Sequence, residues 1–295
     1  MLPVEVFRQV RQVHIRTRRL VDGIFAGEYH SVFKGCGIEF AEVREYMPGD
    51  DIRTIDWNVT ARVGQPFVKQ YVEERELTVM LLVDMSASGQ FGTVSRLKSE
   101  IATELSAVIA LSAITNNDKV GLALFTDKVE RFIAPQKGKN RALRLIRELL
   151  TFKPESKGTD IGGAMEYLHT VTHRRAVVFV ISDFFGDSFD KPLRLLHKRH
   201  DVIPVCLVDR RDMELPAVGF MRLHDLESGQ EVLVDTDSAA VRAHFNGSRR
   251  KAAEDRRRMF RSMGLDSIDV HTDETYIRPL MRFFRRRERR LGEGR

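Results

Sequence analysis

The sequence predicts an α/β protein with a doubly wound, mostly parallel β-sheet and a small β-rich element before it. Four strongly apolar segments have the length and composition of buried parallel strands: residues 79–83, 120–125, 176–182 and 202–208. Segments with helical periodicity separate them. Because strands that alternate with helices form a sheet covered on both faces, this order favours an open α/β fold.

The segments between the strands predict helices and one hairpin. Apolar residues recur at helical spacing over 95–115, and again over 140–152, where Asn140 is a candidate N-cap. A third helix is expected from about Asp160. Residues 120–137 contain two strand patterns around a turn, so one edge of the sheet is expected to be a hairpin.

The segments that flank the sheet differ from it in pattern. Residues 27–76 show no helical period and are dense in charge and glycine, which indicates a small β-rich substructure. A hairpin turning at Ser228–Gly229 follows the last strand, and a long helix then runs to about Met263, with Gly264 as its stop. We therefore divide the chain into an N-terminal helix and β-rich segment (1–76), an α/β domain (77–272) and a basic C-terminal helix or tail (273–295).

Composition narrows the class of protein. Of the 295 residues, 42% are hydrophobic and 31% are charged, so the chain can bury a sizeable core. No apolar run reaches the length that crosses a bilayer, and arginine and glutamine interrupt the first twenty residues, unlike a signal peptide. Two distant cysteines, Cys36 and Cys206, suit a reducing compartment. We expect a cytoplasmic protein.

The positive charge is concentrated at one end of the chain. Residues 278–295 contain eight arginines and two glutamates, which account for the whole formal net charge of +6. The remainder is neutral, so the sequence does not predict a basic groove and we do not expect nucleic acid as the partner. Binding of nucleic acid through the arginine-rich tail remains an alternative.

The apolar run 79–83 ends on a carboxylate, Asp84, and two serines follow at alternate positions, Ser86 and Ser88. Extended geometry points these three side chains the same way. Carboxylate and hydroxyl oxygens suit a hard cation such as Mg²⁺, Mn²⁺ or Ca²⁺. An ordinary helix cap, with the aspartate paired to a lysine, explains these three residues equally well.

Two further segments favour the cation. The strand 176–182 also runs into a carboxylate, Asp183, and Thr159 lies in a glycine-flanked loop just before a helix. In an open α/β sheet, ligands bind at the carboxyl ends of the strands, where the strand order reverses. The three segments together predict one divalent-cation site.

The motifs "DMSAS", "GTDIGGAM" and "VISDFFGD" resemble, in this order and strand context, the metal-ion-dependent adhesion site of von Willebrand factor type A domains. The resemblance covers roughly residues 77–210 and implies a Rossmann-like sheet. It also implies that one divalent cation is held by five residues, all of which match: Asp84, Ser86, Ser88, Thr159 and Asp183.

The block before the first strand, residues 35–77, resembles the signature of the bacterial family called domain of unknown function 58. Members of that family place this block directly before a type A domain. Many are encoded beside MoxR-type AAA+ ATPases, so the resemblance implies such an ATPase as partner.

The stretch "REYMPGDDIRTIDW" within this block gathers alternating charges and the only tryptophan. One interpretation is a partner-binding face. The other is a lattice of salt bridges around a turn at Pro48 and Gly49, which the alternating signs favour. The candidates for the face are Arg44, Asp50, Asp51, Arg53, Asp56 and Trp57.

A shell of two aspartates and three neutral hydroxyls balances a divalent cation and leaves it able to accept a carboxylate from another protein. The sequence therefore predicts a non-enzymatic, cation-dependent binding module, an adaptor or co-chaperone for the ATPase. Neither a nucleophile elbow nor a P-loop is present. A metal-dependent hydrolase or nuclease that uses the same aspartates is the alternative.

Overall fold

The computed structural model describes residues 29, 32, 39–72, 77–93, 96–186, 189–224 and 229–293. The chain divides into two compact units, residues 33–77 and the remainder. The amphipathic helix expected within the first twenty residues lies outside the described part.

The small unit is a two-stranded antiparallel ribbon with two short helices between its strands. Strand β1 (Glu39–Glu45) pairs with β2 (Phe67–Val72), and η2 (Ile52–Thr54) and α3 (Trp57–Val63) lie between them. The ribbon confirms a β-rich element, but α3 was not expected. Asp56 caps this seven-residue helix by accepting from the amide of Asn58 at 3.0 Å, and Gly64 ends it with φ 79°. Two turns are too short to show a helical period.

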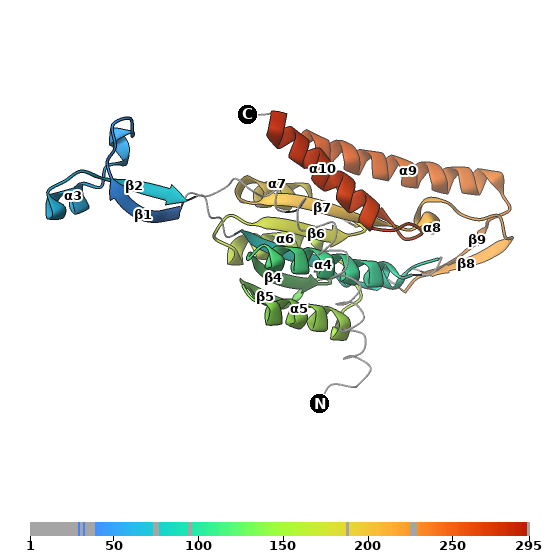
Figure 1. Ribbon diagram of the computed structural model, residues 1–295. Coiled ribbons are helices and arrows are strands. Elements are labelled where there is room, and N and C mark those ends of the chain that lie inside the picture. The colour runs from blue at the N-terminus through green and yellow to red at the C-terminus, as the bar shows by residue number, and fades with distance from the viewer. Residues whose placement is uncertain are drawn as a thin grey trace. The chain divides into compact units, whose positions relative to one another are not determined.

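The large unit is built on a six-stranded sheet in the order β10-β7-β6-β3-β4-β5 (Figure 1). Five strands are parallel and β5 pairs antiparallel with β4, so the predicted fold class and edge hairpin are confirmed. The strands are β3 (Thr78–Asp84), β4 (Lys119–Phe125), β5 (Val129–Gln136), β6 (Val177–Ser182), β7 (Asp201–Val208) and β10 (Ile268–His271).

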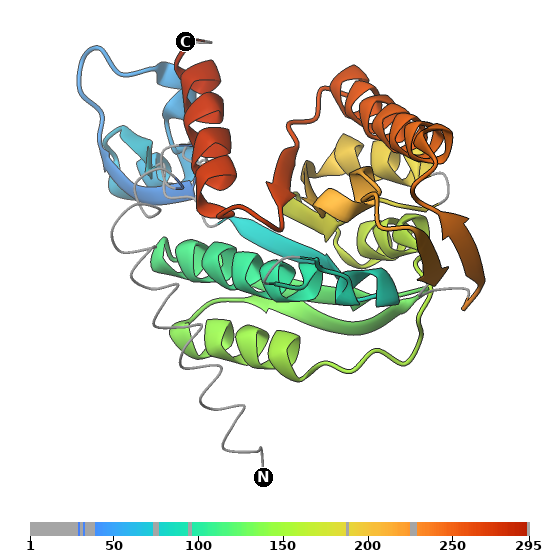
Figure 2. The same cartoon turned by 90° about the vertical axis from the view of Figure 1, so that its right-hand side faces the viewer.

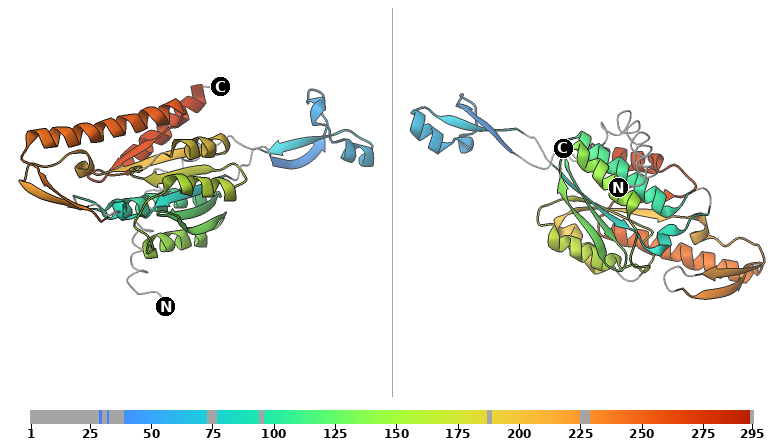
Figure 3. Two further views of the ribbon diagram at one scale, coloured as in Figure 1. Left: turned by 180° about the vertical axis from the view of Figure 1, so that it is seen from behind. Right: turned by 90° about the horizontal axis from the view of Figure 1, so that it is seen from below.

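Helices cover both faces of this sheet. Helices α4 (Lys98–Thr115) and α5 (Lys139–Thr151) lie side by side on one face (Figure 2). Helices α6 (Ile161–Val171) and α7 (Asp190–Arg199) pack together on the other (Figure 3). Successive strand residues point to opposite faces, so Met80 and Leu82 of β3 belong to the α6–α7 core.

Local signals set the helix ends. Asp160 caps α6 by accepting from the amide of Gly163 at 2.8 Å, as the expected start near Asp160 requires. The expected N-cap of α5 is wrong by two residues, because Gly138 is the N-cap and Asn140 lies inside the helix.

The segment after β7 carries a hairpin and two helices. Strands β8 (Phe220–His224) and β9 (Glu231–Asp235) pair antiparallel, as predicted, although most of the turn between them lies outside the described residues. Between β7 and this hairpin stands α8 (Arg210–Met213), and α9 (Ala239–Ser262) follows it and ends before Gly264, which has φ 73°. The hairpin lies beside the first part of α9 (Figures 1 and 3).

The arginine-rich end forms α10 (Ile277–Glu293), which buries Phe283 and Phe284. Within the described part of the chain, no helix combines the length and the hydrophobicity needed to cross a membrane.

Candidate metal-binding site

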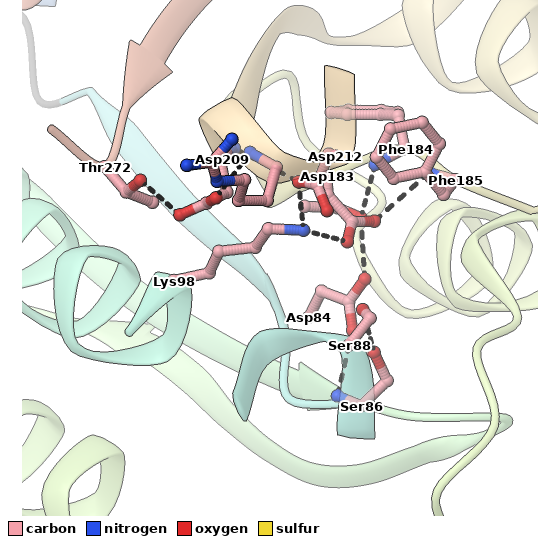
Figure 4. Close-up of polar contacts among 12 residues, drawn as sticks. Asp84, Ser86, Ser88, Lys98, Asp183, Phe184, Phe185, Asp209, Asp212 and Thr272 are labelled. Carbon is pink, nitrogen blue, oxygen red and sulfur yellow. Dashed lines mark hydrogen bonds and ion pairs between the residues drawn. The ribbon is translucent and has the colours of Figure 1, made fainter. Parts of the chain in front are cut away.

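The carboxyl ends of β3 and β6 bring two acidic side chains to one edge of the sheet (Figure 4). β3 ends at Asp84, and Asp183 follows β6 directly. These strands are hydrogen-bonded neighbours at the centre of the sheet, where the chain passes from one half to the other. Asp84 is 7% exposed and Asp183 is 4% exposed. Two buried carboxylates on adjacent strands need positive charge or donors close by.

Donors from two segments, the turn after β3 and the end of β6, surround Asp84. The Ser86 amide donates to its Oδ1 at 3.0 Å, and the Ser182 hydroxyl donates to its Oδ2 at 2.6 Å. The hydroxyls of Ser86 and Ser88 lie 3.0 Å apart beside it, in the turn that leads into η3 (Ala87–Gln90). Four of the five predicted cation ligands therefore gather at this strand edge.

Thr159, the fifth, is placed by its loop between α5 and α6. The Ala87 amide donates to the Lys157 carbonyl at 3.0 Å, which holds this loop against the turn of Ser86 and Ser88. The Asp160 amide donates to the carbonyl of Thr126, just after β4, at 2.8 Å. Thr159 is half-buried, and the residue that caps α6 is its neighbour Asp160.

Its surroundings disfavour the charge of Asp84. Burial, together with the negative charge of Asp183, raises the pKa of Asp84 to about 6, although the Ser182 and Ser86 hydrogen bonds oppose the rise. At neutral pH the folded chain therefore carries a carboxylate in a place that disfavours its charge. Such a place favours any cation that can reach it.

A lysine that sequence reasoning missed lies next to Asp183, the other carboxylate of the pair. Lys98, the first residue of α4, is 2% exposed. Its ammonium lies 3.0 Å from Asp183 Oδ2 and 2.7 Å from Asp212 Oδ2 (Figure 4). Burial alone would lower the pKa of Lys98, but the charges of Asp183 and Asp212 outweigh burial and raise it. A lysine in the first turn of an apolar helix, where the helix dipole disfavours cations, was the available signal.

A third buried aspartate, Asp209, directly follows the neighbouring strand β7. Asp209 is fully buried and accepts from the amide and hydroxyl of Thr93 at 3.0 and 2.6 Å, the amide of Arg211 at 2.8 Å and the hydroxyl of Thr272 at 2.6 Å. The amide of Asp209 in turn donates to Asp212 at 3.1 Å. Asp209 thereby links three loops at the same edge of the sheet. Because four donors already occupy its carboxylate oxygens, its role is structural.

The segment after Asp183 is held in an unusual conformation. Phe184 has φ 54°, a left-handed value that costs a residue with a side chain about 1 kcal/mol or more. Its ring packs against Phe189 and Phe260, with ring centres 5.4 and 5.5 Å apart. This packing retains the strained backbone, and the Phe185 amide consequently donates to Asp183 Oδ1 at 3.1 Å.

The donor set fits a hard divalent cation by its chemistry. It offers two carboxylates and neutral hydroxyls, all oxygen. Among the residues that the structure describes, no three His, Cys, Asp or Glu side chains gather as metal ligands. This agrees with a set in which only two members are acidic.

The aspartates of the charged block in the small unit form hydrogen bonds and an ion pair within that unit. Arg44 and Asp50 form a two-pronged ion pair at 2.7 and 2.8 Å, which raises the pKa of Arg44 and lowers that of Asp50. Asp51 caps η2 by accepting from Arg53 at 2.9 Å, and Asp56 caps α3. Trp57, in contrast, is 69% exposed.

Comparison with known proteins gives the family. Residues 42–256, which include the small-unit block and the strand-edge cluster, match the family described as "Protein of unknown function DUF58". The chain belongs to the DUF58 family. The assignment predicted from residues 35–77 is thus confirmed.

Relatives of this DUF58 chain cover most of its length. Uncharacterized protein Rv1480 of Mycobacterium tuberculosis is 32% identical over 95% of this chain and 89% of its own. Uncharacterized protein YeaD of Bacillus subtilis is 26% identical over 59% of this chain and 41% of its own.

Two solved structures are similar at low sequence identity. BatB from Bacteroides thetaiotaomicron matches 72% of this chain and 99% of its own, with a TM-score of 0.47 and 14% identity. The SpRpn10 VWA domain matches 69% of this chain and 92% of its own, with a TM-score of 0.37 and 12% identity.

A concavity of about 640 Å³ lies between α9, β10 and α10 of the DUF58 chain. Two aspartates there pair with three of its five lining arginines. Arg257 binds Asp269 at 2.7 Å, and Arg286 and Arg290 bind Asp266 at 3.5 and 2.8 Å. Arg287 of the tail also pairs with Asp201, so part of the tail's charge is paired within the fold, as expected for a surface helix.

Proposed function

We propose that this protein is a non-enzymatic protein-binding module whose contact with its partner depends on a divalent cation, Mg²⁺ or else Mn²⁺ or Ca²⁺. Asp84, Ser86, Ser88, Thr159 and Asp183 would hold the cation. The observation that carries the proposal is the burial of Asp84 and Asp183 on neighbouring strands, with hydroxyls beside them and the pKa of Asp84 raised.

The charges of this set suit a bridging cation. Two carboxylates balance a divalent ion and the hydroxyls add no charge, so the cation would keep the ability to bind one more anionic oxygen. When bound, the cation supplies a Lewis-acid position for a carboxylate of another protein. Asp84 and Asp183 would fix the ion, and the turn of Ser86 and Ser88 would orient it.

The contacts of the two aspartates support binding rather than hydrolysis. In the described part of the chain, their side chains meet serine hydroxyls, backbone amides and the Lys98 ammonium. Hydrolysis would further require a general base and a positioned nucleophile. Turnover of phosphoesters that disappears in Asp183→Ala would instead favour the metal-dependent hydrolase or nuclease.

We further propose that the partner is a MoxR-type AAA+ ATPase, met in the cytoplasm, to which this chain is an adaptor or co-chaperone. Membership of the DUF58 family supports this choice, because the family resemblance implies such a neighbour. The partner would offer an acidic residue to the cation. Trp57, exposed on the small unit, belongs to the candidate partner-binding face.

Thermal melting with and without cation tests the metal site. Millimolar Mg²⁺ or Mn²⁺ should raise the melting temperature, because a ligand at a hundred times its Kd adds about 2.7 kcal/mol to stability. Asp84→Ala should abolish the rise, and Glu166→Ala, which removes an exposed carboxylate, should keep it. An unchanged wild-type melting curve would overturn the proposal.

A pull-down tests the partner. The purified MoxR-type ATPase encoded by the same organism should be retained by the wild type in Mg²⁺. Retention should be lost with chelator or with Asp84→Ala. Equal retention of the ATPase by Asp84→Ala would contradict a cation bridge and would show that the two proteins associate directly.

A further inference from the structure

Lys98 is a buried cation placed between two acidic side chains. Its ammonium lies 3.0 Å from Asp183 Oδ2 and 2.7 Å from Asp212 Oδ2, and its side chain is 3% exposed. The rings of Phe91 and Phe185 each lie 5.6 Å from the ammonium and shield it from water. The Coulomb attraction between charges is far stronger in such surroundings than at a surface, and loss of one partner leaves the other as an uncompensated buried charge.

This ammonium already neutralises part of the charge that a divalent cation would neutralise. Asp183 uses Oδ2 for Lys98 and Oδ1 for the Phe185 amide, so a cation would have to share Asp183 with the lysine. Arg256 is also close, but its guanidinium reaches only the main-chain carbonyl of Asp183, at 2.9 Å. Among the described residues, Lys98 is thus the cationic side chain that contacts the carboxylate of Asp183.

Asp212 offers the lysine a second carboxylate outside the proposed ligand set. It lies in α8, where its carboxylate accepts from the Asp209 amide at 3.1 Å and is fixed by that bond. If Asp183 turned to a divalent ion, the ammonium could keep Asp212 as its partner. A buried lysine would then never be left without a counter-charge.

We propose that Lys98 is a built-in competitor of the divalent cation. Without the cation the ammonium holds Asp183, and with it the ammonium stays with Asp212, so the pair of Lys98 and Asp212 sets the affinity of the site. This inference rests on the proposed function, since it requires that the site bind a divalent ion.

The test is calorimetric titration of the full chain with Mn²⁺ alone, comparing dissociation constants. Lys98→Met should tighten Mn²⁺ binding by about tenfold or more, because a buried unit charge within a few ångströms acts with energies above 1.4 kcal/mol. Asp212→Asn should weaken binding by a similar factor, because the lysine then depends on Asp183 alone. In the Lys98→Met background, Asp212→Asn should have little further effect.

Arg256→Met is the matched control. It removes a buried positive charge near Asp183 without removing a contact to the carboxylate. Its effect on Mn²⁺ affinity should be clearly smaller than that of Lys98→Met. An equal effect would mean that the summed positive charge of the region, and not the contact of Lys98 with Asp183, sets the Mn²⁺ affinity. That result would overturn a specific role for Lys98.

The remaining outcomes separate this inference from the proposed function. If the wild type binds no Mn²⁺, the proposed function fails and this inference fails with it. If the wild type binds but Lys98→Met binds equally or more weakly, only the role of Lys98 is overturned. Should Lys98→Met not fold even with Mn²⁺ present, Asp212→Asn decides: weaker binding supports the competition, and unchanged binding overturns it.

Discussion

The hydroxyl of Ser182 on β6 donates a 2.6 Å hydrogen bond to the carboxylate of Asp84 on β3. The same hydroxyl oxygen accepts from the amide of Phe184 at 3.0 Å. One small side chain therefore joins the ends of two adjacent strands and the strained turn that carries Asp183. The relative position of the two carboxylates is fixed by the sheet itself, before any cation binds.

This arrangement predicts that Asp84→Asn stabilises the protein when cations are removed. The pKa of Asp84 is raised to about 6 in the folded chain, so the fold disfavours its charge at neutral pH. Removing the charge should raise the free energy of unfolding at pH 7 by about 2 kcal/mol. Chemical denaturation in chelator measures it.

The same variant should lose all stabilisation by Mg²⁺ or Mn²⁺. By the same reasoning, wild-type stability in chelator should rise through this group as the pH falls from 7 toward the ordinary aspartate pKa, and Asp84→Asn should lack that rise. A less stable Asp84→Asn in chelator would show that the hydrogen bonds of the carboxylate outweigh its charge.

Substitution of Asp209, unlike Asp84→Asn, should strongly destabilise the protein. Although burial alone would raise its pKa, hydrogen bonds from Thr272, Thr93 and the Arg211 amide hold the pKa of Asp209 below its usual range. Asp209→Ala would leave those donors unpaired in the interior, and we expect a loss of about 3–5 kcal/mol in urea unfolding. Thr272→Val, which removes one of the donors, is the graded control and should lose about 1–2 kcal/mol. Equal losses would contradict a shared network.

Gly121 of β4 should not tolerate a side chain. A Cβ there would lie 2.5 Å from the sulfur of Met80 and 2.9 Å from the carbonyl of Ile133, between the two neighbouring strands. The methionine can move but the backbone cannot, so Gly121→Ala should cost about 1–3 kcal/mol. Gly247→Ala, in a helix with open space around it, should be neutral or stabilising. Thermal melting of both variants compares them.

The strands and the two aspartates were predictable for a common physical reason. A parallel strand buried on both faces is a continuous apolar run, so β3, β4, β6 and β7 are visible in the sequence. Asp84 and Asp183 break such runs at their ends, and parallel strands bring those ends to one edge. Periodicity and topology together therefore placed these two side chains near each other.

The rest of the site depends on tertiary contacts. The first-turn position of Lys98 marks it as an unusual lysine but does not name its partner, because its pairing with Asp183 joins residues 85 positions apart. Strand β10 is only four residues long and alternates polar with apolar, so no pattern distinguishes it from a loop.

His200 should make the protein lose stability in mild acid. It is 2% exposed at the end of α7, and its Nδ1 accepts from the Ala176 amide at 3.2 Å. Burial, with the charges of Arg199 and His169, lowers the pKa of His200 to about 4. The unfolded chain, with an ordinary pKa near 6.5, takes up the proton first as the pH falls.

Stability from this group is therefore complete above about pH 6.5 and is lost between about pH 6.5 and 4, with a loss of about 2 kcal/mol from pH 7 to 5. His200→Asn keeps an acceptor for the Ala176 amide but cannot be protonated, so its unfolding free energy should fall less over this range. His173→Asn, at an exposed histidine, should retain the wild-type slope. Denaturant unfolding at several pH values measures the slopes, and an unchanged slope in His200→Asn would place the acid sensitivity elsewhere.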